Sequence, residues 1–246
     1  MPAPLVALRG VDKVYSNGVV ALRGLDLAVH EGEFLSLLGP SGCGKSTVLR
    51  LIAGLGELTG GTIEWSSVQH EIGFVFQDPT LMPWATVLNN IYLPLRVRGV
   101  PRAEARPRIE RAMEQVGLAG FGNAYPRELS GGMRMRVSIA RALVAEPRVL
   151  LMDEPFAALD EITRFKLNDD LLALCASQRW TVVFVTHSVF ESVYLSTRIL
   201  VMCARPGRVS SEVLIETQRD ASFRTSAAYA EQCRTVSTRL AEAMQA

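Results

Sequence analysis

A glycine-rich stretch near the N-terminus has the composition of a phosphate-binding loop. It follows the apolar run 34–38, precedes a helix-like stretch at 45–53, and fits the pattern G-x-x-x-x-G-K-[ST]. The glycines let successive backbone N–H groups point inward, and the positive end of the following helix adds to this anion nest. The stretch consists of Gly39, Pro40, Ser41, Gly42, Cys43, Gly44, Lys45, Ser46 and Thr47. We expect Lys45 to reach the β- and γ-phosphates of a nucleotide and the Ser46 hydroxyl to bind Mg²⁺.

Two adjacent carboxylates supply the second part of a nucleotide site. The run 149–152 is apolar throughout, as expected of a buried strand, and Asp153 and Glu154 follow it directly. Parallel sheets bind ligands at the carboxyl ends of their strands. Asp153 is therefore a candidate Mg²⁺ ligand, and Glu154 can orient or deprotonate the attacking water.

Another glycine-rich segment indicates a second contact with phosphate. The residues Leu129-Ser130-Gly131-Gly132-Met133 precede a helical run that extends to residue 143. Ser130 can cap the start of this helix, while Gly131 and Gly132 allow close approach of a phosphate group. Because the Lys45 loop already completes one phosphate site, this second one indicates a shared ligand.

The segments that must position these residues alternate between strands and helices. Strand-like segments lie at 5–14, 19–29, 34–38, 72–76, 149–152, 181–185 and 199–202, and helix-like segments at 45–53, 161–176, 189–195 and from about 223. We expect Gly54 to end the first helix and Thr59, Gly60 and Gly61 to form the next turn. The alternation predicts an α/β fold: a P-loop NTPase core with a mostly parallel sheet and an N-terminal antiparallel β subdomain.

Between about 79 and 145 helix-type spacing dominates and strand signals fade, which predicts an inserted α-helical subdomain. We therefore expect one domain over 1–246. Its α/β core comprises 1–78 and 146–222, its helical subdomain 79–145 and its C-terminal helical tail 223–246.

The composition excludes several classes of protein. The 246 residues carry a net charge of +1 and 48% apolar residues, so the chain can bury a core and has no field that attracts nucleic acid. A cluster of arginines fits a solvated helix face better than a nucleic-acid site; it consists of Arg96, Arg98, Arg102, Arg106, Arg108 and Arg111. The four scattered cysteines predict neither zinc nor disulfides, and no run is long enough to span a membrane.

Taken in order, the motifs resemble those of ABC-type ATPases, whose signature is usually written L-S-G-G-Q. The resemblance runs from about residue 5 to residue 215. It implies that Gln77 contacts Mg²⁺ and the water, that His187 senses the γ-phosphate, and that Asp160 lies in a loop at a dimer interface. Tyr15 lies where the family places an aromatic residue that stacks on adenine; packing of Tyr15 on the core is the alternative. Met133 occupies the usual glutamine position, so a polar contact there is absent.

The resemblance also implies partners and a location. Two copies would enclose two ATP molecules between the Lys45 loop of one and the Ser130 segment of the other, on the cytoplasmic face of a membrane. The segment 153–160 and Ala204-Arg205-Pro206-Gly207-Arg208 resemble the nitrate, sulfonate and taurine group of importers, and 186–194 resembles importers of thiamine precursors. A separate permease and, indirectly, a substrate-binding protein are therefore expected, and nucleic acid is not.

Three alternatives stay open at this stage. The apolar segment 78–84 either lines a groove for the permease or is buried in the helical subdomain. The chain is either a transport subunit or an ABC-type ATPase of DNA maintenance or translation, although it lacks the coiled coil or second cassette usual there; a plain GTPase would not explain Ser130 to Gly132. Because Cys43 lies within the phosphate loop, we expect its alkylation to inhibit and ATP to protect.

Overall fold

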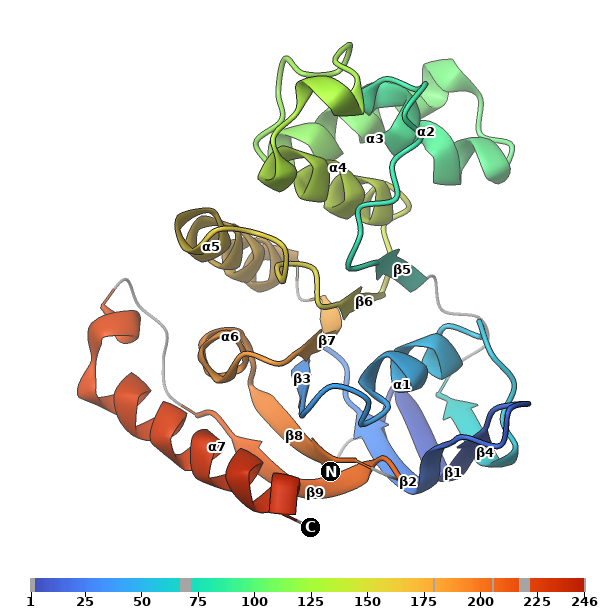
Figure 1. Cartoon of the computed structure of the whole chain (residues 1–246). Coiled ribbons are helices and arrows are strands. Elements are labelled where there is room, and N and C mark those ends of the chain that lie inside the picture. Colours follow the sequence, from blue (N-terminus) through green and yellow to red (C-terminus); the bar gives the residue numbers. More distant parts are fainter. Residues whose placement is uncertain (1–2, 67–71, 179, 205, 217–221, 246) are drawn as a thin grey trace. The chain divides into compact units, whose positions relative to one another are not determined.

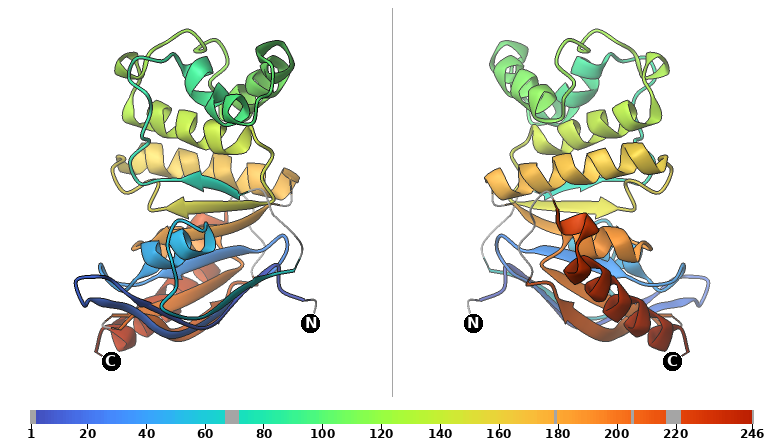
Figure 2. Two further views of the ribbon diagram at one scale, coloured as in Figure 1. Left: turned by 90° about the vertical axis from the view of Figure 1, so that its right-hand side faces the viewer. Right: turned by 90° about the vertical axis from the view of Figure 1, so that its left-hand side faces the viewer.

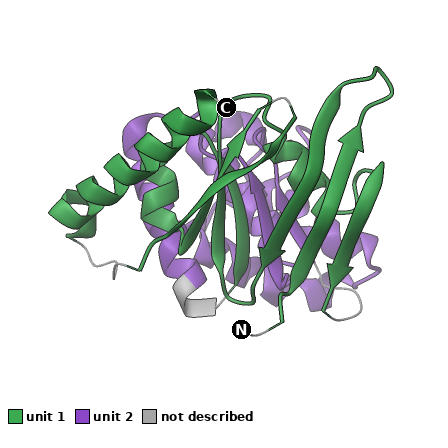
Figure 3. Cartoon of the chain, turned by 90° about the horizontal axis from the view of Figure 1, so that it is seen from below, with its two compact units in different colours: residues 1–69, 180–246 green, residues 70–179 purple. Residues whose placement is uncertain are grey.

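A computed structural model of the chain describes residues 3–66, 72–178, 180–204, 206–216 and 222–245. The chain forms two compact units (Figure 3): unit 1 comprises Met1–Gln69 and Trp180–Ala246, and unit 2 comprises His70–Arg179. Arg205, one of the residues that resemble the importer group, lies outside the described residues. The predicted boundaries at 78, 145 and 222 remain a prediction, and each unit is described below by itself.

An antiparallel sheet forms one part of unit 1 (Figure 1). Strand β1 (Val6–Val14) pairs with both β2 (Val20–Val29) and β4 (Gly60–Trp65), in the order β2-β1-β4. Asn17 and Gly18 make the turn between the first two strands, because Gly18 adopts a φ of +82° and the Asn17 side chain accepts from the Val19 N–H. The N-terminal antiparallel β subdomain expected from the sequence is therefore confirmed.

The central strands of unit 1 are parallel and mostly apolar. Strand β3 (Phe34–Leu38) pairs in parallel with β7 (Thr181–Thr186) and β8 (Arg198–Cys203), and β9 (Arg208–Leu214) pairs antiparallel with β8. All residues of β3 and β7 are buried, which is the pattern of strands covered on both faces. The mostly parallel α/β core is thus present.

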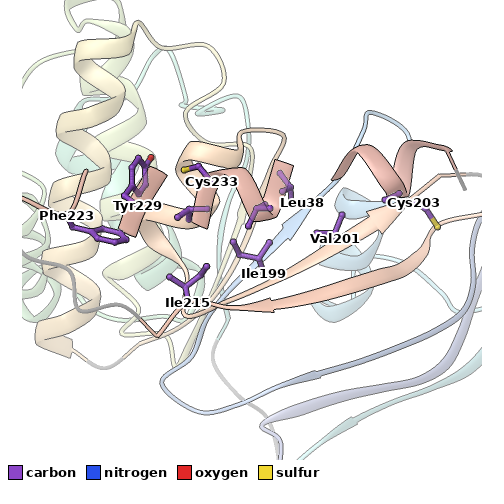
Figure 4. Close-up of a cluster of buried hydrophobic side chains, with 11 residues drawn as sticks. Leu38, Ile199, Val201, Cys203, Ile215, Phe223, Tyr229 and Cys233 are labelled. Carbon is purple, nitrogen blue, oxygen red and sulfur yellow. The ribbon is translucent and has the colours of Figure 1, made fainter. Parts of the chain in front are cut away.

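Helices cover these strands within unit 1. Helix α1 (Lys45–Ile52) follows β3, α6 (Val189–Leu195) follows β7, and α7 (Ala227–Gln245) follows the short turn η2 (Phe223–Thr225). Helix α7 packs on α6 and β8 through a buried cluster that includes Phe223, Tyr229 and Cys233 (Figure 4). As expected, Gly54 follows the end of α1 with a φ of +69°.

Unit 2 contains a pair of parallel strands and a group of helices. Strand β5 (Ile72–Val75) pairs with β6 (Val149–Asp153). The helices are α2 (Val87–Val97), α3 (Arg102–Gln115), α4 (Gly131–Leu143) and α5 (Glu161–Gln178), with a turn η1 (Pro126–Glu128) before α4. Helices α2, α3 and α4 pack on one another, and α4 and α5 lie side by side (Figure 2). The expected helical segment 79–145 falls within this unit.

Two strands differ from the expectations. Gly60 and Gly61, expected in a turn, begin β4; Gly61 adopts a φ of +79° and lies so close to the β1 backbone that a Cβ would be 2.4 Å from the Gly10 carbonyl oxygen. Strand β9 was not expected, because its half-exposed face carries few apolar residues. No helix within the described ranges is both long enough and apolar enough to span a membrane.

Candidate nucleotide-binding site

The glycine-rich loop connects β3 to α1 in unit 1, and its glycines have the left-handed backbone that such a loop requires. Gly42 has a φ of +81° with open space where a Cβ would be, and Gly44 has a φ of +91°. Gly44 is the N-cap of α1, and no described side chain caps this helix. The backbone N–H groups of the first turn therefore face a position that suits phosphate oxygens.

The glycine-rich loop packs tightly against neighbouring backbone of unit 1. A Cβ on Gly39 would lie 2.6 Å from the Met202 carbonyl oxygen at the end of β8, and one on Gly207 would lie 2.2 Å from the Cys43 carbonyl oxygen. Gly207 also donates its N–H to the Ala21 carbonyl. The loop is thus supported by β2 and by the turn between β8 and β9, and Gly207 is a supporting residue that the motif alone does not reveal.

Lys45 is 4% exposed and folds back onto its own loop. Its Nζ donates to the Gly39 carbonyl at 2.7 Å and to the Pro40 carbonyl at 3.0 Å. These carbonyls hold the ammonium group over the loop, where phosphate oxygens can replace them as partners. The geometry fits the expected contact of Lys45 with phosphate.

Burial of Cys43 disfavours the expected inhibition by alkylation, which remains a prediction. The residue is fully buried, and its Sγ lies 3.9 Å from Lys45 Nζ. Burial raises the pKa of this thiol, and the nearby Lys45 charge only partly opposes the effect. The side chain points into the protein because the nest is built from backbone groups, so the thiol is not a loop ligand.

Tyr15 lies directly after β1 and is tied to the helix that follows the phosphate loop. Its hydroxyl and that of Thr47 are hydrogen-bonded at 3.0 Å, and Lys13 Nζ lies 5.3 Å from the ring centroid. The ring is 38% exposed, so it is not packed in the core. This exposed ring beside the loop suits stacking on a nucleotide base.

His187 lies between β7 and α6 in unit 1, and its side chain is exposed. Thr186, the residue before it, ends the strand, and Ser188, the residue after it, is the N-cap of the helix. The position at a carboxyl end of a parallel strand is where such sheets bind ligands.

The two acidic candidates lie at the end of β6 in unit 2. Asp153 is buried, and Glu154 adopts a φ of +46°, a conformation that non-glycine residues rarely take. Strain of this kind concentrates at functional sites, where it fixes the direction of a side chain. The turn that follows is held by a hydrogen bond from the Ala157 N–H to the Glu154 carbonyl.

Three motif segments meet in a cleft of about 380 Å³ within unit 2. Gln77 and Asp78 contribute one wall, Gly131 and Arg134 of the α4 start another, and Ala158 and Leu159 a third; Pro79, Met135 and Pro155 complete the lining. Gln77 itself is exposed. The structure thus brings together the glutamine, signature and Asp160 segments that the sequence placed far apart.

The signature segment begins α4 as the sequence predicted. Ser130 is the N-cap, and its Oγ accepts a hydrogen bond from the Met133 N–H at 3.2 Å. The two glycines differ in their surroundings: a Cβ on Gly132 would lie 2.6 Å from Thr163 Cγ2, whereas one on Gly131 would make only ordinary contacts. Gly132 is therefore required by the packing of α4 on α5, and Gly131 leaves room for a ligand.

Arg141 is a residue of this region that sequence reasoning missed. From the last turn of α4 its guanidinium donates to the Pro79 and Thr80 carbonyls at 2.7 and 2.9 Å. Thr80 adopts a φ of +46°, so these bonds hold a strained turn three residues after Gln77. Burial lowers the Arg141 pKa. No local pattern in the sequence predicts this contact, because Arg141 and the carbonyls it binds lie far apart in the chain.

The predicted Mg²⁺ ligands fit a hard cation, because they offer a hydroxyl (Ser46), an amide oxygen (Gln77) and a carboxylate (Asp153). Ser46 belongs to unit 1, and Gln77 and Asp153 belong to unit 2. Among the residues that the structure describes, no group of three or more His, Cys, Asp or Glu side chains is arranged to hold a metal ion. A single carboxylate matches Mg²⁺, which in nucleotide sites takes further ligands from phosphate and water.

Comparison with known proteins decides the family. A family model described as ABC transporter matches residues 22–157, more than half of the chain. The chain belongs to the ABC transporter family. It is an ATP-binding cassette with ATPase activity and the P-loop α/β fold of these cassettes.

Two relatives are similar in sequence to this cassette over most of its length. An aliphatic sulfonates import ATP-binding protein of Pseudomonas syringae pv. syringae is 47% identical over 224 residues, which cover 89% of this chain and 90% of the relative. An uncharacterized ABC transporter ATP-binding protein of Methanocaldococcus jannaschii is 49% identical over 208 residues, 82% of this chain and 78% of the relative.

Solved structures of cassettes resemble the fold. A dimeric ATP-binding cassette bound to ADP and phosphate in a post-hydrolysis state has a TM-score of 0.76 and 35% identity, covering 87% of this chain and 100% of that one. The protein cbiO1 of Clostridium perfringens, part of the ABC transporter complex cbiONQ, has a TM-score of 0.79 and 26% identity, covering 98% and 97%.

Proposed function

We propose that this cassette is the ATP-hydrolysing subunit of an importer that takes up a small organic sulfonate through a separate membrane permease. The observation that carries the proposal is the 47% identity, over nine-tenths of both chains, with a protein named for the import of aliphatic sulfonates. Further relatives of that name, from Pseudomonas and Bacillus, are 42% to 47% identical. Importers of thiamine precursors, which the segment 186–194 resembles, are the second candidate.

Unit 1 supplies the groups that bind ATP. The loop from Gly39 to Thr47 holds the phosphates through backbone N–H groups and the Lys45 ammonium, and Tyr15 stacks on the adenine. Ser46 provides a hydroxyl for Mg²⁺, which when bound neutralises charge that develops on the transferred phosphate. His187 holds the γ-phosphate and the attacking water in place.

Unit 2 supplies the groups that act on the water. Asp153 and Gln77 would hold Mg²⁺, Gln77 would also contact the attacking water, and Glu154 takes the proton of this water as general base. The strained backbone at Glu154 supports this role, because it fixes the carboxylate direction before ATP binds.

A second copy of the chain completes each site. Ser130, Gly131 and Gly132 of one copy contact the γ-phosphate held by the Lys45 loop of the other, in a head-to-tail dimer with two ATP molecules. The solved relative with ADP and phosphate is itself dimeric, which supports this arrangement. ATP binding closes the dimer and hydrolysis reopens it.

The permease docks on unit 2, at the cytoplasmic face of the membrane. Trp84 is 77% exposed, which excludes its burial in the helical core and favours the groove interpretation of the segment 78–84. Trp84 and Met82 line a cleft of about 480 Å³ with Tyr92, Leu93 and Arg96. A cleft lined by aromatic, aliphatic and basic side chains suits a short amphipathic helix of a partner. A substrate-binding protein acts upstream of this complex.

The proposal is tested by growth of a strain that lacks this chain, with an alkanesulfonate or with sulfate as the sole sulfur source. We expect growth on sulfate only. The intact gene and Lys166→Ala, which changes an exposed lysine, should restore growth on the alkanesulfonate, and Glu154→Gln should not. Growth on the alkanesulfonate without the gene contradicts the substrate class, and a requirement for a thiamine precursor would establish the second candidate.

A further inference from the structure

The residues before and after His187, Thr186 and Ser188, are both linked by hydrogen bonds to the Glu191 carboxylate. The Ser188 N–H donates to Thr186 Oγ1 at 3.0 Å, and the Thr186 hydroxyl donates in turn to Glu191 Oε2 at 2.6 Å. Thr186 ends β7, Ser188 is the N-cap of α6, and Glu191 lies in the first turn of this helix. The backbone before and after His187 is thus fixed by one chain of bonds.

This arrangement differs from a simple capping box in one informative way. Ser188 Oγ accepts from the Glu191 N–H at 3.3 Å, which is half of that motif. In the other half, the glutamate three residues on accepts directly from the N-cap N–H. Here the Thr186 hydroxyl stands between the two groups. A direct bond would fix only the helix start, whereas the inserted hydroxyl also fixes the residue that precedes His187.

The carboxylate is buried, which makes its bonds strong. Glu191 is 6% exposed and Thr186 is 2% exposed. Burial of a carboxylate costs free energy unless it is hydrogen-bonded, and a charge-assisted bond in a low-dielectric interior is stronger and polarises the next bond in the chain. The hydrogen bond from the Thr186 hydroxyl, next to His187, helps to offset the cost of burying the Glu191 carboxylate.

Helix α7 supports the same turn from the other side. The Tyr229 hydroxyl donates to the Phe190 carbonyl at 3.0 Å, one residue before Glu191. The Tyr229 ring packs edge-on to Phe223 in the buried cluster (Figure 4). Because a helix as short as α6 is marginal alone, this contact with α7 keeps its first turn in place.

We propose that Glu191 is a positioning residue for His187, acting through Thr186 and Ser188. It holds the imidazole in the direction needed at the γ-phosphate without touching ATP itself. The inference rests on the role proposed above for His187, so its test has one readout that needs neither ATP nor turnover.

That readout is the NMR spectrum of the nucleotide-free protein labelled at histidine rings. The chain has three histidines, so the His187 signal is assigned by its loss in His187→Ala. We expect Glu191→Gln and the nearly isosteric Thr186→Val to shift or broaden the His187 signal and leave that of His30 unchanged. Glu231→Gln, on the exposed face of α7, is the matched control and should change neither.

Turnover is measured on the same proteins. In Glu191→Gln and Thr186→Val, kcat should fall about tenfold while KM for ATP stays within about twofold, because the phosphate loop and Tyr15 are untouched. An unchanged His187 signal in both variants overturns the proposal, as does a KM that rises as much as kcat falls. Wild-type turnover in His187→Ala would instead overturn the proposed role of His187, whatever the Glu191 variants show.

Discussion

Two glycine-rich helix starts, those of α1 and α4, were both expected to bind phosphate, and they are built differently. At α1 the N-cap is left-handed Gly44, which makes no side-chain capping hydrogen bond. At α4 the Ser130 side chain already caps the helix, and Gly132 packs on Thr163. The α4 start thus has a side-chain cap, whereas the α1 start has none.

In the proposed head-to-tail dimer, this difference would explain how one ATP molecule contacts both helix starts. A helix start without a side-chain cap offers its first backbone N–H groups to a phosphate. A helix start that is already capped can meet a phosphate and leave it again without exposing unsatisfied groups. The α1 loop therefore suits the copy that holds ATP, and the α4 start suits the copy that closes on it.

The largest effect is expected at the α1 loop. Lys45→Ala removes the ammonium group that stabilises charge on the phosphates, and ATPase activity should fall roughly 100-fold or more. Turnover and ATP affinity are measured beside Lys166→Ala, which lies on an exposed face of α5 and should match the wild type. Wild-type affinity and turnover in Lys45→Ala would show that the loop does not hold ATP.

Glu154→Gln separates binding from hydrolysis. We expect ATP binding to persist and turnover to drop by about 100-fold, because the general base is lost while the phosphate contacts remain. The closed dimer should then accumulate with ATP and be visible by size-exclusion chromatography with light scattering. Turnover near wild type would remove Glu154 from the chemistry.

The two signature glycines sharpen the comparison further. Gly132→Ala should destabilise the fold by about 1–3 kcal/mol because its Cβ collides with Thr163, and Thr163→Ala should restore the stability. Gly131→Ala should leave the melting temperature close to the wild-type value and lower turnover. Thermal unfolding of the three variants decides this; equal loss of stability in both glycine variants would contradict the assignment of packing to Gly132 alone.

The smallest effect concerns Cys43. Burial raises the pKa of Cys43, so little thiolate is present near neutral pH. The rate of alkylation should therefore rise only at a pH above the pKa of an ordinary thiol. Mass spectrometry after brief treatment with iodoacetamide at pH 7 should find Cys43 unmodified with or without ATP. Rapid modification that ATP prevents would place the thiol in the nucleotide site.

Motifs identified the candidate site residues more readily than the residues that support them. The Lys45 loop, the acidic pair and the Ser130 cap were read directly, because each needs particular residue types at a fixed spacing in one segment. Gly207 and Arg141 act on backbone groups distant in sequence, so no local pattern predicts them. Glu191 did have a local signal, since Ser188 and Glu191 have the spacing of a capping box.

The missed strands have a similar explanation. Two adjacent glycines favour a turn, and only the close approach of Gly61 to the backbone of β1 shows why they stand in a strand. Strand β9 is half exposed, so its apolar pattern is too weak to distinguish it from a loop. The buried strands β3, β6 and β7 were found because each contains an almost unbroken run of apolar residues.

The sharing of ATP between the two kinds of helix start is tested most directly by mixing two inactive variants, Lys45→Ala and Ser130→Arg. In a mixed head-to-tail dimer, one site receives intact Lys45 from one copy and intact Ser130 from the other. We predict that each variant alone is inactive and that the mixture recovers up to roughly a quarter of wild-type ATPase activity, since half of random dimers are mixed and each has one intact site. A mixture as inactive as its components would contradict the shared site.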